Sequence, residues 1–178
     1  DRFKSHIEDT MRAGAQHNDR HVVRFMVENG PKAIRFLQDL GVEFQEEPGL
    51  EGGHSHPRVW RTSDFTGQDI LNALIRAVKK EKAITIQENT DVVELMEHQN
   101  RCHGAFIRRG ESAKMEPLYA RHTILATGGL GQLFGRTTNT FGSSGDGLAL
   151  AINAGLEMKD LEFIQFHPTA FAKPDEGR

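Results

Sequence analysis

The sequence predicts a chain of the α+β or α/β class, in which N-terminal helices precede an antiparallel β-meander. Three observations support this fold class. Apolar residues recur at helical spacing through the first 40 residues. Four short runs of β-forming residues, separated by polar turns, follow between residues 83 and 121. Two glycine clusters, residues 126–131 and 143–147, then stand after an expected strand and before an expected helix.

Three helices are expected before residue 42. The first carries an apolar stripe at i, i+4 spacing, formed by Phe3, Ile7 and Met11. The second begins with Asp19 as its N-cap and ends at Asn29-Gly30. Pro31 suits the first position of a third helix, because an N–H group is not needed there, and Gly41 ends that helix.

Residues 42–65 show no periodicity and predict a long loop, centred on the sequence Glu51-Gly-Gly-His-Ser-His-Pro-Arg58. Loops of this length in compact domains are usually functional. A further helix is expected from Thr66, with Thr66 and Asp69 as a capping box. Three lysines near its end suit the negative pole of the helix dipole: Lys79, Lys80 and Lys82.

The expected strands of the meander are Ala83–Gln87, Asp91–Met96, Gly104–Arg108 and Leu118–Arg121. Thr123–Ala126 is a short apolar run that predicts a buried strand leading into the first glycine cluster. A helix over Leu148–Ala154, ended by Gly155, follows the second cluster. Leu161–Phe166 predicts a last strand, which places His167 at its end.

The composition excludes several classes of protein. With 178 residues, 37% of them apolar, the chain is long enough for one domain with a core and is neither disordered nor fibrous. The net charge of −3 argues against a nucleic-acid binder, and no apolar run approaches the length of a membrane span. The single cysteine, Cys102, excludes an internal disulfide and suits a reducing, cytoplasmic compartment. The charged ends indicate a piece of a longer protein.

The two glycine clusters are the first candidate site. Glycines before a helix let a ligand approach the backbone, and the first-turn N–H groups attract anions. The segments are Ala126-Thr127-Gly128-Gly129-Leu130-Gly131 and Ser144-Gly145-Asp146-Gly147, and neither fits the dinucleotide-binding spacing GxGxxG. The residues alone favour a plainer alternative, in which the glycines form turns and Asp146 only offsets the helix dipole.

Histidines and one glutamate form a second set of candidates. His167, at an expected strand end and followed by Pro168, either binds a ligand carboxylate or caps the strand. Glu51, beside two glycines, either meets a cationic amine or is an exposed loop carboxylate, and the residues alone favour the latter. His54 and His56 suit loop anchoring or substrate contact better than a metal site, because a single cysteine without a CxxC pair leaves the ligand set of a structural zinc site incomplete.

Three motifs, in this order and spacing, resemble the flavoprotein family of succinate dehydrogenase, fumarate reductase and L-aspartate oxidase. They are Thr127-Gly128-Gly129, Ser144-Gly145-Asp146-Gly147-Leu148-Ala149 and Glu162-Phe-Ile-Gln-Phe-His-Pro-Thr169. The segment Glu51–Arg58, followed by Thr66-Gly67, is most similar to the L-aspartate oxidase branch. The resemblance implies that residues 1–178 are the central part of one Rossmann-like FAD-binding domain. The N-terminal βαβ unit and the capping domain are lacking, and the connection to the latter begins near 170–178.

The resemblance also implies roles for individual residues. Seven positions match the FAD contacts of the family: Asp146, Gly145, Asp91, Val92, Ala126, Thr127 and Gly128. Asp146 matches a hydrogen-bonding aspartate, while Asp91 and Val92 match backbone contacts to the adenine end. His167 matches a histidine that binds a substrate carboxylate beside the flavin, with Thr169 in the same motif. Glu51 matches the acid that recognises the amino group of aspartate. No metal ligand is implied.

The implied reaction is hydride transfer from the Cα of L-aspartate to the flavin, which gives iminoaspartate for quinolinate and NAD synthesis. The implied partners are a small dicarboxylate, either L-aspartate or fumarate, and quinolinate synthase. Two alternatives remain open: a fumarate reductase or succinate dehydrogenase flavoprotein subunit, and a non-catalytic binding module. We expect the isolated chain to bind FAD weakly or not at all and to be inactive.

Overall fold

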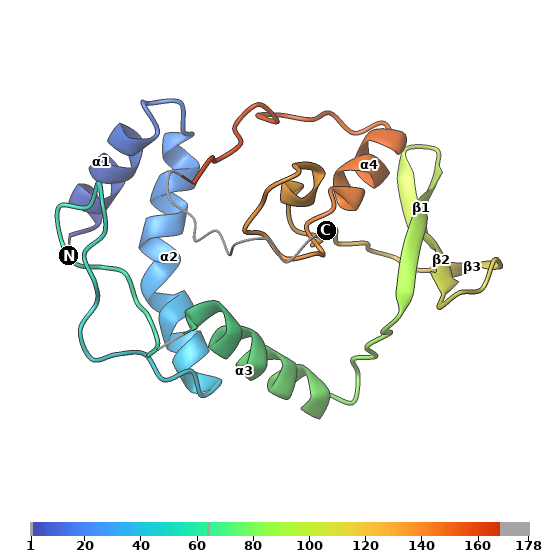
Figure 1. Ribbon diagram of the computed structural model, residues 1–178, viewed down its shortest axis with the longest axis horizontal. Helices are drawn as coiled ribbons and strands as arrows, with labels where there is room; N and C mark the ends of the chain where they lie inside the picture. Colours follow the sequence, from blue (N-terminus) through green and yellow to red (C-terminus); the bar gives the residue numbers. More distant parts are fainter. Residues whose placement is uncertain (1, 64, 168–178) are drawn as a thin grey trace. The chain divides into compact units, whose positions relative to one another are not determined.

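A computed structural model describes residues 2–63 and 65–167 of the chain. The chain divides into two compact units, residues 1–86 and 87–178, and each is described here by itself. Among the described residues, unit 1 contains three helices, and unit 2 contains an antiparallel sheet, a short 3₁₀ helix and one α-helix (Figure 1). Thr169, Pro168 and the expected connection near 170–178 lie outside the described residues.

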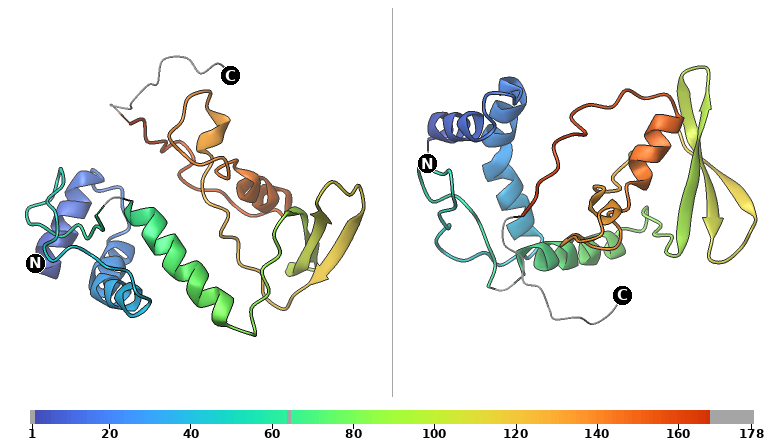
Figure 2. Two further views of the ribbon diagram at one scale, coloured as in Figure 1. Left: turned by 60° about the horizontal axis from the view of Figure 1, so that its bottom comes forward. Right: turned by 45° about the horizontal axis from the view of Figure 1, so that its top comes forward.

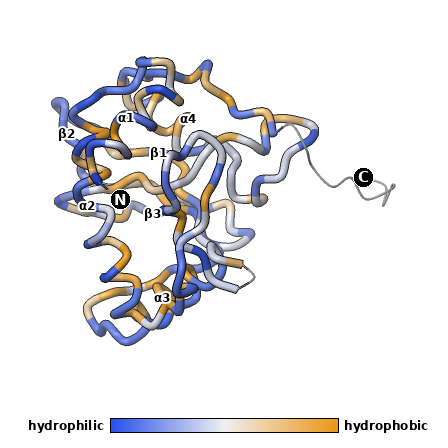
Figure 3. The backbone as a smooth tube through the Cα atoms, turned by 90° about the vertical axis from the view of Figure 1, so that its left-hand side faces the viewer, coloured by the Kyte–Doolittle hydropathy of each residue, from blue (hydrophilic) through white to orange (hydrophobic). Residues whose placement is uncertain are grey.

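In unit 1, helix α1 (Phe3–Ala13) packs against helix α2 (Arg20–Asp39). Their contact is a buried apolar cluster formed by Ile7, Met11, Val23 and Val27. Each pair is spaced by four residues, so both apolar side chains of a helix lie on one face. Hydrophobic and hydrophilic stretches accordingly alternate along α2 (Figure 3).

The expected break at Gly30-Pro31 is wrong, because α2 continues through Pro31 to Asp39. Pro31 lacks an N–H group and leaves one carbonyl of the preceding turn without its helical partner. The expected start is confirmed: the Asp19 carboxylate accepts hydrogen bonds from the N–H groups of His21 (2.8 Å) and Val22 (3.3 Å). Gly41, with φ +86°, follows the helix end as expected.

The loop after α2 is confirmed as irregular, and an isolated bridge closes it. Gly49 and Val59 exchange two backbone hydrogen bonds, of 2.8 and 3.0 Å. Helix α3 (Thr66–Lys80) begins where the sequence predicted, but the capping box is wrong. Thr66 already lies inside the helix, and its hydroxyl accepts the N–H of Thr62 instead (3.1 Å).

In unit 2, the predicted meander is confirmed. Its strands run in the order β1 (Thr90–His98), β2 (Arg101–Arg109) and β3 (Met115–Tyr119), each antiparallel to the next (Figure 2). The expected fourth run, at 118–121, began too late, since β3 pairs from Met115. Ala83–Gln87 forms no strand, because within the described chain no strand lies alongside it.

Helix α4 (Asp146–Asn153) packs against β1, and Gly155, with φ +77°, follows its end as expected. The expected strands Thr123–Ala126 and Leu161–Phe166 are wrong: both segments are irregular. A strand needs partners for its backbone groups, and the described residues supply none at either place. The Ile124 side chain, expected to be buried, is 87% exposed. Within the described chain, no helix is long and apolar enough to span a membrane.

Candidate functional site

The two glycine clusters meet in unit 2. The N–H of Gly145, just before α4, donates a hydrogen bond to the carbonyl of Gly129 (3.1 Å). The N–H of Gln132, in the 3₁₀ helix η1 (Gly131–Leu133), donates to the carbonyl of Ser143 (2.9 Å). Two segments 16 residues apart in the sequence, Gly129 and Gly145, are therefore joined through their backbones.

The turn also packs directly against the helix. Gly147 is buried in the first turn of α4, and a Cβ atom there would overlap the side chain of Thr127. Only glycine lets the backbone of α4 approach Thr127 this closely. Sequence reasoning included Gly147 in the motif but assigned it no role, because a contact between distant segments leaves no mark in spacing.

The start of α4 presents polar groups to solvent. Gly145 precedes the helix with φ +82°, a conformation that favours glycine. Asp146 is exposed in the first turn, and its Oδ2 accepts a hydrogen bond from the Ser144 hydroxyl (2.6 Å). The first N–H groups of an α-helix generally have no helical partner and can receive a ligand oxygen. Here the N–H of Leu148 already donates to the carbonyl of Gly145 (3.0 Å).

The glycine turn is open enough for a nucleotide to lie against it. Ala126, Thr127 and Gly128 are exposed, and Gly128 has φ +73°. Side-chain positions built at Gly128 and Gly129 meet no atom within 4 Å. Exposed backbone beside a helix start is the arrangement that binds the phosphates of dinucleotides, so these residues fit FAD.

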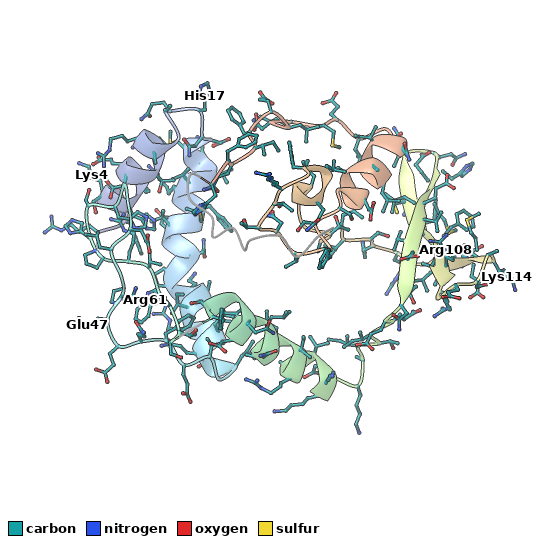
Figure 4. The ribbon with its side chains drawn as sticks, in the orientation of Figure 1. Lys4, His17, Glu47, Arg61, Arg108 and Lys114 are labelled. Atoms are coloured by element: carbon teal, nitrogen blue, oxygen red, sulfur yellow. The ribbon has the colours of Figure 1, made fainter. Side chains whose placement is uncertain are left out.

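Asp91 and Val92 lie at the start of β1, both exposed. Asp91 Oδ2 accepts a hydrogen bond from Nη2 of Arg108 on β2 (2.8 Å; Arg108 is labelled in Figure 4). A small cavity of about 130 Å³ lies between the middle of β1 and the end of α4. Its lining includes neither Asp91 nor Asp146, so a shared role of these two carboxylates at one nucleotide stays a prediction.

The histidine motif approaches the first glycine cluster. Phe166, next to His167, contacts Phe134 edge to face, with ring centroids 6.0 Å apart. Phe134 directly follows η1, which begins at Gly131 of that cluster. His167 itself is exposed. Aromatic contact thus links the third motif to the glycine turn within unit 2, while the expected role of Thr169 lies outside the described residues.

Glu51 belongs to unit 1, whereas His167 and all the residues expected to bind FAD belong to unit 2. Glu51 is exposed, and its carbonyl accepts a hydrogen bond from the N–H of His54 (3.1 Å). This bond forms a turn in the loop. The glycine clusters and the His167 segment thus lie together in unit 2, whereas Glu51 lies in unit 1.

Asp9 is a buried residue that sequence reasoning missed. Its carboxylate accepts hydrogen bonds from the Ser55 N–H (2.7 Å), the Ser55 hydroxyl (2.6 Å), Arg58 Nη1 (2.8 Å) and Arg12 Nη2 (2.5 Å). The hydrogen bonds from Ser55, and then that from Arg58, hold the pKa of Asp9 well below its usual range. Because the partners lie 46 and 49 residues away, no helical pattern marks this aspartate.

Two histidines lie beside this carboxylate. The rings of His6 and His54 meet edge to face, with centroids 6.3 Å apart. Burial lowers the pKa of His6 below 6.5, the charges of Arg58 and His54 lower it further, and the charge of Asp9 opposes them. Among the described residues, no group of three or more histidine, cysteine or acidic side chains is arranged to hold a metal ion.

Comparisons with known proteins match the whole chain. Residues 1–178 match the sequence family described as FAD binding domain. An L-aspartate oxidase from Clostridium perfringens is 41% identical over 184 residues, covering 99% of this chain and 41% of that protein. A Methanocaldococcus jannaschii protein named as an uncharacterized FAD-dependent oxidoreductase is 38% identical over 175 residues, covering 95% of this chain and 32% of that protein.

A similar fold occurs in a solved structure. A mutant of the quinol fumarate reductase of E. coli matches with a TM-score of 0.89 and 26% identity, over 95% of this chain and 30% of that chain. This match confirms the expected fold class, a partial FAD-binding domain with a meander and N-terminal helices. The chain spans 41% and 32% of the length of the two curated relatives.

Proposed function

Since the chain belongs to the FAD binding domain family, among the flavoproteins related to succinate dehydrogenase, fumarate reductase and L-aspartate oxidase, we propose that its gene product oxidises L-aspartate to iminoaspartate. One observation carries the FAD site: the backbone of the glycine turn is joined to the start of α4. FAD supplies the hydride acceptor when it is bound. We also propose that both units are parts of one FAD-binding domain.

The exposed groups of unit 2 would hold the cofactor. The backbone at Ala126, Thr127 and Gly128 offers polar groups without covering side chains, and the start of α4 offers N–H groups beside Asp146. An anionic group is favoured at such a helix start. Asp91 and Val92 would contact the adenine end through their backbone, in keeping with their exposed place at the start of β1.

The substrate would be positioned by three residues. L-aspartate carries two carboxylates and one ammonium group, so it needs partners of both charges. The His167 imidazole, with Thr169 in the same motif, would hold one carboxylate, and the Glu51 carboxylate would pair with the ammonium group. Holding the substrate in one orientation would place its Cα hydrogen for hydride transfer to the flavin, while the nitrogen loses a proton to solvent as the C=N bond forms.

A fumarate reductase or succinate dehydrogenase flavoprotein is the second candidate, favoured by the structural match to quinol fumarate reductase. Glu51 separates the two, because succinate and fumarate have no ammonium group. A third candidate, a non-catalytic module, would carry no bound flavin. We further propose a cytoplasmic location. We also propose quinolinate synthase as a partner, since an imine hydrolyses in water and a partner enzyme that uses it at once limits this loss.

The test uses the FAD-loaded gene product that carries this sequence. Glu51→Gln should lower the rate of aspartate oxidation more than that of fumarate reduction, because only aspartate needs the negative charge. Glu47→Gln is the matched control, since Glu47 is another exposed carboxylate of the same loop (Figure 4). Equal losses in the two activities would overturn the assignment to aspartate.

A further inference from the structure

The loop that carries Glu51 is fastened at its base and at its middle. At the base, Gly49 and Val59 exchange two backbone hydrogen bonds. At the middle, Ser55 donates through both its N–H and its hydroxyl to the carboxylate of Asp9 on α1. Residues 49–59, called here the Glu51 loop, are thus tied to a helix 46 residues earlier in the sequence.

The fastening at the middle is an ion pair that water hardly reaches. Arg58, within the Glu51 loop, donates from Nη1 to Asp9 Oδ2 at 2.8 Å, and the two side chains are 7% and 4% exposed. Burying two charges is expensive, and apolar side chains of similar volume often stabilise a protein as well. Stability alone therefore does not account for this pair. The ion pair instead holds Ser55 and Arg58 at fixed positions relative to α1.

The fixed place extends to Glu51. Ser55 directly follows His54, whose N–H closes the turn that begins at Glu51. The His54 ring in turn lies against His6, so α1 contacts the loop at adjacent positions. A long loop without such ties samples many conformations, each of which places the Glu51 carboxylate differently.

We propose that Asp9 is a positioning residue: through Ser55 and Arg58 it holds the Glu51 loop in the conformation that receives the substrate. The proposal rests on the proposed function in so far as Glu51 meets the substrate. Asp9 touches neither substrate nor cofactor in this account, so its loss should weaken substrate binding more than the chemical step.

The experiment compares variants of the FAD-loaded gene product. Asp9→Asn keeps the shape but removes the charge, while Ser55→Ala keeps the ion pair and removes one hydrogen bond. Glu28→Gln removes an exposed carboxylate from α2 and serves as the charge-matched control. Two quantities are measured: amide hydrogen exchange at Ser55, and KM and kcat for L-aspartate and for fumarate.

In Asp9→Asn, exchange at Ser55 should accelerate by about tenfold or more, because a charge-assisted hydrogen bond is lost. The KM for L-aspartate should rise by about tenfold with a smaller change in kcat. Ser55→Ala should move both quantities in the same direction by less, and it decides the matter if Asp9→Asn fails to fold. Glu28→Gln should move neither.

Two outcomes overturn the proposal. Unchanged exchange at Ser55 would show that Asp9 does not hold the loop. Faster exchange with an unchanged KM would show that the ion pair supports the fold and not the substrate. Failure of the proposed function looks different: a wild-type protein that turns over neither L-aspartate nor fumarate refutes that function, while the exchange data still decide whether Asp9 anchors the loop.

Discussion

Thr127 and Gly147 lie so close together that any side chain at position 147 would overlap the threonine. Thr127 stands in the turn after the irregular segment 123–126, and Gly147 lies in the first turn of α4. This contact and the hydrogen bond from Gly145 to Gly129 fix the glycine turn against the helix start. The relationship matters because the proposed FAD site consists of those two parts.

Gly147→Ala should therefore weaken FAD binding. The new methyl group must displace Thr127 or α4, at a cost of about 1–3 kcal/mol for an overpacked site. Because the overlap destabilises the arrangement of turn and helix that binds FAD, the dissociation constant of FAD should rise by about tenfold or more. Titration of the apoprotein with FAD, followed by flavin fluorescence, measures this.

The control for that titration is Gly142→Ala. A Cβ atom at position 142 meets nothing within 4 Å, and the backbone φ there is not positive. Its FAD affinity should match the wild type. If Gly147→Ala also binds FAD with wild-type affinity, the contact between Gly147 and Thr127 is not needed for flavin binding.

Gly145→Ala tests the helix start through the backbone. Gly145 has φ +82°, and an alanine in this left-handed conformation costs about 1–2 kcal/mol. Its Cβ would also lie 3.2 Å from Leu130 Cβ, which is a tight contact. We expect a lower melting temperature and weaker FAD binding, measured by thermal unfolding with and without FAD. Gly135→Ala, at an open site without positive φ, should change neither.

The pKa of His6 should respond in opposite directions to loss of the two partners of the buried ion pair. The charge of Arg58 lowers this pKa and that of Asp9 raises it. Asp9→Asn should thus lower the pKa of His6 further, and Arg58→Gln should raise it, both read from an NMR titration of the imidazole. Shifts of the same sign in both variants would contradict the described geometry.

The same histidine gives stability a pH dependence. Because the folded-state pKa of His6 lies below its unfolded value of 6.5, the unfolded chain binds the proton more strongly. The contribution of His6 is complete above pH 6.5 and declines as the pH falls below that value. Asp9, whose pKa is also depressed, adds a second loss as the pH falls below about 3.8, its ordinary value. Denaturant midpoints across this range should fall more gently above pH 5 in His6→Gln than in the wild type.

His167→Ala should raise the KM for the dicarboxylate by about tenfold and affect flavin binding little, because the imidazole is expected to contact substrate. The control is His122→Ala, another exposed histidine of unit 2. An unchanged KM in His167→Ala would remove this residue from the site.

Local patterns were enough to predict the meander and α4. The short β-forming runs within β1 and β2, the glycines before α4 and Gly155 after it are all signals within a few residues. The predictions were wrong where the secondary structure of a segment depends on partners that are distant in the sequence. Thr123–Ala126 is apolar enough for a strand, yet the described chain places no strand beside it.

Contacts between distant residues explain the other misses. Nothing near Asp9 indicates Ser55, because their pairing depends on how a long loop returns to α1. Pro31 suggested a helix start, yet α2 continues through it to Asp39. The sequence shows a glycine at position 147. The reason that a glycine is needed there, its contact with the side chain of Thr127, appears only in the three-dimensional structure.

The most direct test of the central claim is reduction of the bound flavin without oxygen. The FAD-loaded gene product is mixed anaerobically with L-aspartate while the visible flavin absorbance is followed. The account predicts that the absorbance bleaches at a rate that saturates with L-aspartate, and that Glu51→Gln slows this bleaching while Glu47→Gln does not. A flavin that stays oxidised with L-aspartate but is reduced by succinate would contradict it.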